Sequence, residues 1–327
     1  MEKVDILLAA YNGELFLKPM LDSILSQTYE DISLIISDDA STDGTAKILR
    51  EYAEKDSRVT VHYQKENLGF VGNFEFLLKQ STAPYVAFSD QDDVWAPEKI
   101  ETMLSELKAS GKSLVYSDMR RIDSEGNVIY ESWMKEKSFP KLSGAAVKAC
   151  AVRHFSAGCS QLFTASVRRK MLPFKSEVFA HDWVSIFCAA ELMGIQYIPT
   201  ALSDYRAHDA NVYGASTDYA ANVIKQSGGD KSYKGYLAYR RALIEQNHLR
   251  GARMCRRYSA LGGGVDDSIA YLEKCADAGY FPPLLHNYFK NMKPNGCGKR
   301  MFYEMLYLHL PAIHYIVYRR ILKGRKQ

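Results

Sequence analysis

Short runs of apolar residues alternate with segments of helical period over the first 120 residues of the chain. The runs are short enough for buried strands, and between them apolar residues recur every three or four positions. The predicted strands are Val4–Ala9, Ile32–Ser37, Val59–Tyr63, Tyr85–Ser89 and Leu114–Ser117. The predicted helices are Leu15–Ser26, Thr45–Ala53, Val71–Gln80 and Pro97–Ala109. This alternation is typical of a parallel sheet with crossover helices, so the sequence predicts an α/β fold of the nucleotide-binding type.

The pattern changes after residue 118. Two short β-like runs flank Asp-Ser-Glu-Gly at 123–126 and predict a hairpin, and a polar loop rich in aromatic residues follows at 131–143. From about residue 215 the chain is predicted to be helical, with a glycine-rich break at 262–264. The hairpin strands and the later elements are predicted at Met119–Ile122, Val128–Tyr130, Ser160–Phe163, Asp182–Glu191 (a helix), Gln196–Ile198 and Ala201–Tyr205.

Composition and charge narrow the class of protein. The 327 residues are 47% hydrophobic and 24% charged, which excludes a disordered or fibrous chain. The net charge of +4 is too small to indicate a nucleic-acid partner. It is unevenly placed, because residues 299–327 carry +6 and the preceding 298 residues carry −2. We therefore expect an acidic body with a basic C-terminal segment.

Cysteine spacing and hydropathy indicate the compartment. The six cysteines form no CxxC pair and no Cys/His ligand spacing, so reduced thiols are expected rather than a structural zinc site. The N-terminal segment has acids at Glu2 and Asp5 and only a short apolar run, so we do not expect it to be a signal peptide. No stretch approaches the roughly 20 apolar residues that cross a bilayer. We expect a cytoplasmic protein.

The strongest local signal for chemistry is the acidic segment that follows the predicted strand Tyr85–Ser89. Asp90, Asp92 and Asp93 crowd three carboxylates into four residues, and a divalent cation would relieve their repulsion by sharing their oxygens. Ligands of open α/β sheets bind at this end of the strands. A solvated acidic turn is the alternative, but the apolar pair at 94–95 makes it the weaker interpretation.

The neighbouring strands also end in polar residues. Asp38 and Asp39 exceed what capping of the next helix requires, so they are candidates to bind a base or a ribose. Tyr11 ends the first strand, where it could stack on a base or simply pack on the sheet edge. Asn67 and Gly69 follow the third strand and are a weak signal alone, because Asn-x-Gly is common in turns.

Two downstream segments carry further candidates. Asp182 opens a predicted helix, where it is either an N-cap or a catalytic carboxylate. Arg206 and His208 end a predicted strand, and a cation beside an imidazole suits a phosphate or a metal as well as a surface ion pair.

Taken together, these segments resemble family 2 glycosyltransferases of the GT-A fold, a nucleotide-binding mixed sheet flanked by helices. The resemblance covers residues 1–214 and is most similar to bacterial rhamnosyltransferases of surface-polysaccharide assembly. It rests on the order and spacing of Ala10-Tyr11-Asn12, Asp38-Asp39-x-Ser41-Thr42-Asp43-Gly44-Thr45, Asn67-x-Gly69, Ser89-Asp90-Gln91-Asp92-Asp93-Val94-Trp95, His181-Asp182-Trp183 and Tyr205-Arg206-x-His208-x-x-Asn211.

The resemblance implies a role for each matching position. Asp182 would be the catalytic base, and Mg²⁺ or Mn²⁺ would be held by Asp92 with Asp90 and His208. The chain departs from the commonest pattern at His181, where many members have Glu. The residues implied to bind the nucleotide sugar are Ala9, Tyr11, Asn12, Asp39, Asn67, Gly69, Asp90, Gln91 and Arg206.

The expected function is an inverting, metal-dependent transfer of a sugar in bacterial polysaccharide biosynthesis, with dTDP-rhamnose favoured as donor and UDP-sugars next. The acceptor would be a glycan or a lipid-linked saccharide. Two alternatives are a phosphatase of the haloacid-dehalogenase type that uses Asp90 as nucleophile, and an inactive membrane-associated scaffold. A phosphatase loop normally follows the first strand, whereas this one follows the fourth.

The expected organisation is a catalytic domain at 1–214 and a helical region at 215–327. Within the catalytic domain, residues 1–118 would bind the nucleotide sugar and 119–214 the acceptor. The basic, partly apolar segment 299–327 suits either a helix on the inner face of an anionic membrane or a helix packed on the catalytic domain or on a second subunit of a homodimer.

Overall fold

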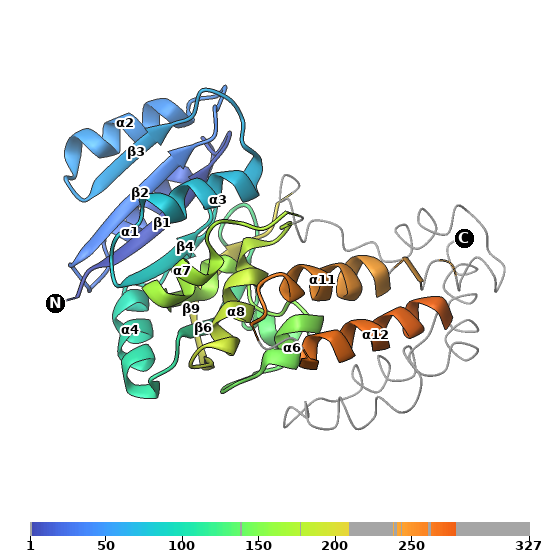
Figure 1. Ribbon diagram of the computed structural model, residues 1–327. Coiled ribbons are helices and arrows are strands. Elements are labelled where there is room, and N and C mark those ends of the chain that lie inside the picture. The colour runs from blue at the N-terminus through green and yellow to red at the C-terminus, as the bar shows by residue number, and fades with distance from the viewer. Residues whose placement is uncertain are drawn as a thin grey trace, which may run out of the picture.

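The computed structural model describes residues 2–137, 139–176, 178–208, 238, 241–242, 244–260 and 263–278. Its centre is one mixed sheet with strand order β3-β2-β1-β4-β8-β6-β9-β5, and β7 pairs with β6 at the side (Figure 1). The strands are β1 (Val4–Ala10), β2 (Ile32–Asp38), β3 (Val59–Tyr63), β4 (Tyr85–Ser89), β5 (Val94–Trp95), β6 (Leu114–Ile122), β7 (Val128–Tyr130), β8 (Gln161–Thr164) and β9 (Ile195–Arg206).

The first four strands are parallel neighbours, as the alternating pattern predicted. The strand β8 then runs antiparallel to both β4 and β6, which makes the sheet mixed. The predicted GT-A type of fold, a mixed sheet flanked by helices, is confirmed. Polar residues at the carboxyl ends of β1, β2 and β4 therefore meet at one edge of the sheet.

Helices cover both faces of the sheet, and each face has its own apolar core. One core is lined by α1, α2 and α4, and the other by α3, α6, α7 and α8. The helices of the sheet-containing part are α1 (Leu17–Leu25), α2 (Thr45–Lys55), α3 (Gly69–Gln80), α4 (Lys99–Ser110), α5 (Trp133–Glu136), α6 (Val147–Val152), α7 (Ala165–Met171) and α8 (His181–Glu191).

Two sequence predictions about the strands were wrong. The segments predicted as Gln196–Ile198 and Ala201–Tyr205 form one strand, β9, because a bulge absorbs the proline between them. Ile198 and Ala201 pair with consecutive residues of β6, which leaves Pro199 without a ladder hydrogen bond to donate. Likewise β6 continues unbroken from Leu114 to Ile122. The sequence did not predict four short elements, which are β5, α5, α6 and α7. Each has only two to seven residues, too few to show a hydrophobic period.

The C-terminal helices η2 (Glu245–Leu249), α11 (Arg250–Arg256) and α12 (Gly263–Ala278) lie beside α6 and α8 (Figure 1). Gly251 of α11 sits directly on the indole of Trp183, and a Cβ at this position would lie only 1.9 Å from the ring. The guanidinium of Arg250 stacks over Phe179 at 4.1 Å. These contacts attach α11 to the first turn of α8 and to the segment just before it. The basic segment 299–327 lies outside the described residues, among which no helix is long and apolar enough to cross a membrane.

His181, the first residue of α8, is part of the apolar core. Its ring stacks on Phe74 with centroids 3.7 Å apart and meets the edge of Phe88 at 4.7 Å. Both ring nitrogens are buried without a hydrogen-bond partner among the described residues. Burial lowers the pKa of His181 to about 4, so the imidazole is neutral in the folded protein near pH 7.

Replacing His181 should therefore change how stability depends on pH. The unfolded chain binds a proton at this residue near pH 6.5, but the folded chain does so only near pH 4, so this group makes stability fall as the pH drops through that window. Protonation of His181 should lower the free energy of unfolding of wild type by on the order of 2 kcal/mol between pH 7 and pH 5, and this loss should be absent from His181→Leu. Urea unfolding of both proteins at the two pH values measures it, with His62→Gln on β3 as the control. An equal loss of stability in wild type and His181→Leu would contradict this account.

Candidate active site

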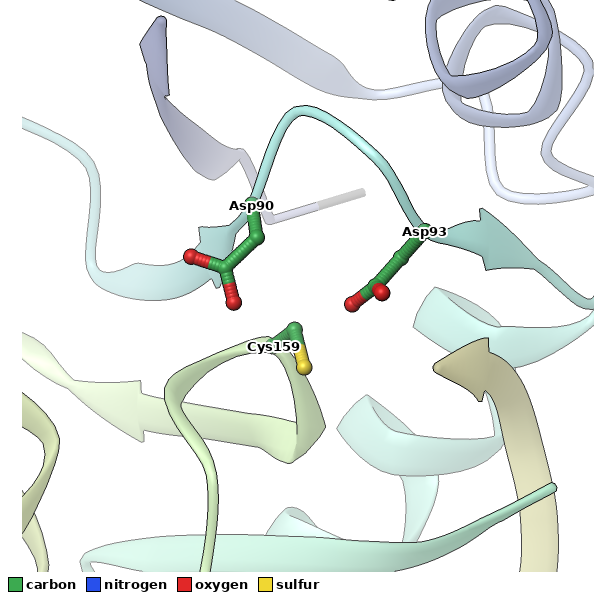
Figure 2. A group of neighbouring side chains, drawn as sticks. All are labelled: Asp90, Asp93 and Cys159. Atoms are coloured by element: carbon green, nitrogen blue, oxygen red, sulfur yellow. The ribbon is translucent and has the colours of Figure 1, made fainter. Parts of the chain in front are cut away.

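The acidic segment predicted from the sequence forms the loop between β4 and β5. Asp93 is fully buried, and its carboxylate faces that of Asp90 and the thiol of Cys159 (Figure 2). One ligand atom from each of these three residues lies within 4.8 Å of the others. Burial, together with the neighbouring carboxylates, raises the pKa of Asp90 well above its usual value and that of Asp93 to about 7. The crowded acids of the loop therefore cannot all be ionised near pH 7 unless a positive charge joins them.

Lys99 lies under this loop. Its side chain is fully buried, and the ammonium donates to the carbonyl of Cys159 and, at 3.4 Å, to the hydroxyl of Ser203. The same ammonium is 3.8 Å from the centre of the Trp95 ring. Burial lowers the pKa of Lys99 to about 8, although Cys159, Asp93 and Asp90 act in the opposite direction. Lys99 offsets part of the negative charge of the loop.

Arg206 fixes the loop to the end of β9. Its backbone N–H donates to the Asp93 carboxylate at 3.2 Å, and its Nε donates to the carbonyl of Asp92 at 2.9 Å. The guanidinium also donates to the carbonyls of Asp123 and Ser124. The sequence analysis assigned Arg206 to the nucleotide sugar, whereas here its guanidinium joins three main-chain carbonyls.

The predicted metal ligands fall into two adjoining groups. Asp92 and His208 are brought together, with Nε2 of the imidazole 2.9 Å from the carboxylate, and the ring lies against Phe16. Asp90 instead groups with Asp93 and Cys159. Sequence reasoning gave no role to Asp93 beyond its charge and overlooked Cys159, because a lone cysteine carries no spacing signal.

The donor atoms of the acidic loop fit a divalent cation. One carboxylate oxygen of Asp93 is buried and accepts no hydrogen bond from a nitrogen or hydroxyl of the described residues. Carboxylate oxygens are the hard ligands that Mg²⁺ and Mn²⁺ prefer. The loop could therefore hold such an ion through Asp90 and Asp93, with Asp92 and His208 beside them.

The loops after β2 and β3 join at Asp39. Its buried carboxylate accepts the N–H of Leu68 at 2.7 Å, and its carbonyl accepts the side-chain amide of Asn67 at 3.2 Å. The oxygen of that amide accepts the N–H of Gly69, whose φ of +71° suits a glycine at the start of α3. Asp39, Asn67 and Gly69, which the sequence analysis assigned to the nucleotide sugar, therefore lie together.

The loop after β1 is held by two side-chain amides. The amide of Gln91 donates to the carbonyl of Tyr11 and accepts its N–H, at 3.0 and 2.8 Å, while the ring of Tyr11 remains 47% exposed. Asn12 has a φ of +47°, and its side-chain oxygen accepts the N–H of Thr42 at 2.8 Å. Gln91 and Asn12 were both predicted to contact the nucleotide sugar, and here their side-chain amides bond to the main chain at the sheet edge. Ala9 lies there too, paired with Ser37 of β2.

Asp182 lies in the first turn of α8, but it is not the N-cap, a position that Ala180 occupies without a side-chain bond. Its carboxylate accepts the N–H of Gly158 at 3.0 Å and that of Trp183 at 2.9 Å, and lies 3.1 Å from Nε2 of His154. Burial raises the pKa of Asp182, but the charge of His154 and these hydrogen bonds outweigh it and lower the pKa to about 2. Its charge helps to raise the pKa of Asp90, so the two carboxylates share one site.

Known proteins with similar sequences and folds are glycosyltransferases. The chain is 28% identical over 288 residues to the Escherichia coli UDP-Glc:alpha-D-GlcNAc-diphosphoundecaprenol beta-1,3-glucosyltransferase WfaP, covering 84% of this chain and 99% of WfaP. It is 27% identical over 240 residues to an uncharacterized glycosyltransferase of Nostoc sp., covering 72% and 74% of the two chains.

Two solved structures share the fold. Residues 1–349 of S. aureus TarS in complex with UDP-GlcNAc align with a TM-score of 0.53 at 14% identity, covering 85% of this chain and 93% of that one. The mannosyltransferase PcManGT from Pyrobaculum calidifontis, in complex with GDP-Man and Mn²⁺, aligns with a TM-score of 0.50 at 17% identity, covering 100% and 88% of the two chains.

The family itself is established by sequence. Residues 5–171, just over half of the chain and most of the sheet, match the model of the family described as glycosyl transferase family 2. The matched segment contains the loops that carry Tyr11, Asp39 and the acidic residues after β4, and it ends before Asp182. The protein therefore belongs to glycosyl transferase family 2 and is a glycosyltransferase.

Proposed function

We propose that the protein is an inverting, metal-dependent glycosyltransferase that moves a sugar from a nucleoside diphosphate to an acceptor hydroxyl in bacterial polysaccharide assembly. The observation that carries the proposal is the pairing of two different acidic sites at one sheet edge. One is the crowded loop of Asp90, Asp92 and Asp93, and the other is the separate, strongly ionised carboxylate of Asp182. Sugar transfer with inversion needs one site for each of its two charge changes.

The first charge change is on the leaving diphosphate. A divalent cation on the loop would neutralise the charge that develops there as the bond to the sugar breaks. Asp90, Asp92, Asp93 and His208 would hold the ion, while Asp39 and the exposed ring of Tyr11 would bind the base. Arg206 would keep the loop in place because its Nε donates to the carbonyl of Asp92, and the buried ammonium of Lys99 would support the adjoining segment by donating to the carbonyl of Cys159.

The second charge change is on the acceptor, whose hydroxyl must lose a proton as it attacks the sugar from the opposite face. Asp182 supplies the negative charge for this step, and its three N–H contacts hold it in one orientation. Because attack and departure are on opposite faces, the anomeric configuration would be inverted.

The comparisons bear on the choice of donor and acceptor. WfaP is named for UDP-Glc and a diphosphoundecaprenol-linked sugar, and TarS was crystallised with UDP-GlcNAc. A UDP-sugar is therefore the first donor to test, and dTDP-rhamnose, which the motifs favour, is the second. A lipid-linked saccharide is the acceptor class we propose. The phosphatase alternative is set aside by the family of the chain, whereas the inactive scaffold remains as an outcome of the experiments.

Binding of the donor should require the divalent ion. We expect a panel of UDP-, dTDP- and GDP-sugars to raise the melting temperature with Mn²⁺ present, and one nucleotide to exceed the others. Asp92→Asn should lose most of that shift because it removes charge at the proposed ion, whereas Asp204→Asn, in the exposed pair with Arg120, serves as the control. Equal shifts with and without Mn²⁺ in wild type would contradict metal-dependent donor binding.

Transfer should depend on Asp182 far more than donor binding does. Asp182→Asn should keep the Mn²⁺-dependent nucleotide shift but lose transfer by ~10²-fold or more, the usual size of a general-base contribution. Turnover is followed by release of the nucleoside diphosphate, with the same donor and acceptor for both proteins. Unchanged turnover in this variant would remove Asp182 from the mechanism, and absence of both binding and turnover in wild type would favour the scaffold.

A further inference from the structure

Trp183 connects the carboxylate of Asp182 to the C-terminal helices. Its backbone N–H donates to Oδ1 of Asp182 at 2.9 Å. Its indole stacks on the imidazole of His154, with ring centres 5.6 Å apart and planes 15° from parallel. Nε2 of that imidazole lies 3.1 Å from Oδ2 of Asp182. The main chain and the ring of Trp183 therefore both bear on the orientation of the carboxylate.

The indole of Trp183 is tightly enclosed. Trp183 is only 3% exposed, and its indole N–H donates to the carbonyl of Cys150 in α6. Gly251 of α11 packs on the six-membered part of the indole, where a Cβ would lie 1.9, 2.3 and 2.5 Å from three ring carbons. A glycine weakens a helix by about 0.5–1 kcal/mol relative to alanine. The close approach of α11 to the ring explains why a glycine occupies this position.

Two further contacts join the C-terminal helices to segments beside Asp182. The guanidinium of Arg250 in α11 stacks over Phe179 at 4.1 Å, and the ring of Phe179 meets the indole of Trp183 edge-on at 5.9 Å. In η2, Nδ1 of His248 lies 2.8 Å from the carbonyl oxygen of Val152 at the end of α6. The C-terminal helices thus contact both chain segments that lie around the carboxylate.

We propose, building on the proposed function, that Gly251 and Arg250 of α11 are positioning residues for the catalytic base. By holding the first turn of α8, α11 keeps the carboxylate of Asp182 in one orientation. Asp182 remains the group that takes the proton, and the two residues of α11 act on the reaction only through Trp183 and Phe179. A shift of about 1 Å in a catalytic group can cost on the order of 10²-fold in rate, so a displaced indole should be felt in kcat.

The first test adds one methyl group to α11 with Gly251→Ala. The methyl must displace the indole, so kcat for sugar transfer should fall by ~10-fold or more, while the KM for the donor and the Mn²⁺-dependent nucleotide thermal shift should change by less than about twofold. Trp183→Phe removes the part of the indole that the methyl would overlap, so the double variant should recover part of the lost kcat. Two independent destabilising substitutions would show no such recovery.

The second test leaves the core intact, because Arg250 is exposed. Arg250→Ala removes the guanidinium over Phe179, and kcat should fall by about threefold to tenfold with the donor thermal shift unchanged. Arg253→Ala is the matched control, since this arginine lies on the same helix but pairs with Glu245 and Glu273. It should keep kcat within about twofold of wild type. All rates are measured as release of the nucleoside diphosphate, below the melting temperature of each variant.

Several outcomes would overturn the inference while leaving the proposed function standing. They are a wild-type kcat in Gly251→Ala, a slow Gly251→Ala that Trp183→Phe does not improve, and equal loss of kcat and of the donor thermal shift. If Gly251→Ala does not fold, the two arginine variants decide, and equal kcat values for Arg250→Ala and Arg253→Ala would overturn the inference. If wild type turns over no donor at all, the proposed function fails, and this role of α11 with it.

Discussion

The rest of the site depends on how the fold tolerates three carboxylates at the end of β4. Burial makes their mutual repulsion severe, as the raised pKa values of Asp90 and Asp93 show. The fold answers with one buried cation and one main-chain donor: the ammonium of Lys99, which donates to the carbonyl of Cys159, and the backbone N–H of Arg206, which donates to the Asp93 carboxylate. Compensation is incomplete, and a site that retains excess negative charge suits a divalent cation and the diphosphate it would carry.

The second half of the site depends on α8 and its supports. Asp182 is placed by the first turn of this helix, and its orientation is secured by Gly158 and by the amide of Gln161. Gly158 leaves no spare room, since a Cβ there would lie 3.1 Å from the ring of His181. On the far side of the helix, Gly251 of α11 packs on Trp183. The C-terminal helices therefore contact Trp183, the residue that follows Asp182.

The parallel half of the sheet could be predicted from the sequence because each strand and helix there is long enough to show its period. The positions of the acidic loop and of Asp39 could also be predicted, because polar residues at the ends of parallel strands converge on one edge of the sheet. Lys99, Gln161 and His154 were not, because each makes its contact in the site with a residue 21 to 104 positions away in the chain. The single strand β9 was read as two, because a proline interrupts the pattern while the bulge keeps the pairing.

The account's central claim is that a divalent ion and the diphosphate meet at the acidic loop, near the separate carboxylate of Asp182. The most direct test is anomalous diffraction from crystals grown with Mn²⁺ and a nucleoside diphosphate. The account predicts one strong manganese peak within coordination distance of the Asp90, Asp92 or Asp93 carboxylates, bridging to the diphosphate, with the base beside Asp39. A nucleotide bound elsewhere, or bound at this edge while Mn²⁺ occupies a site away from these carboxylates, would contradict it.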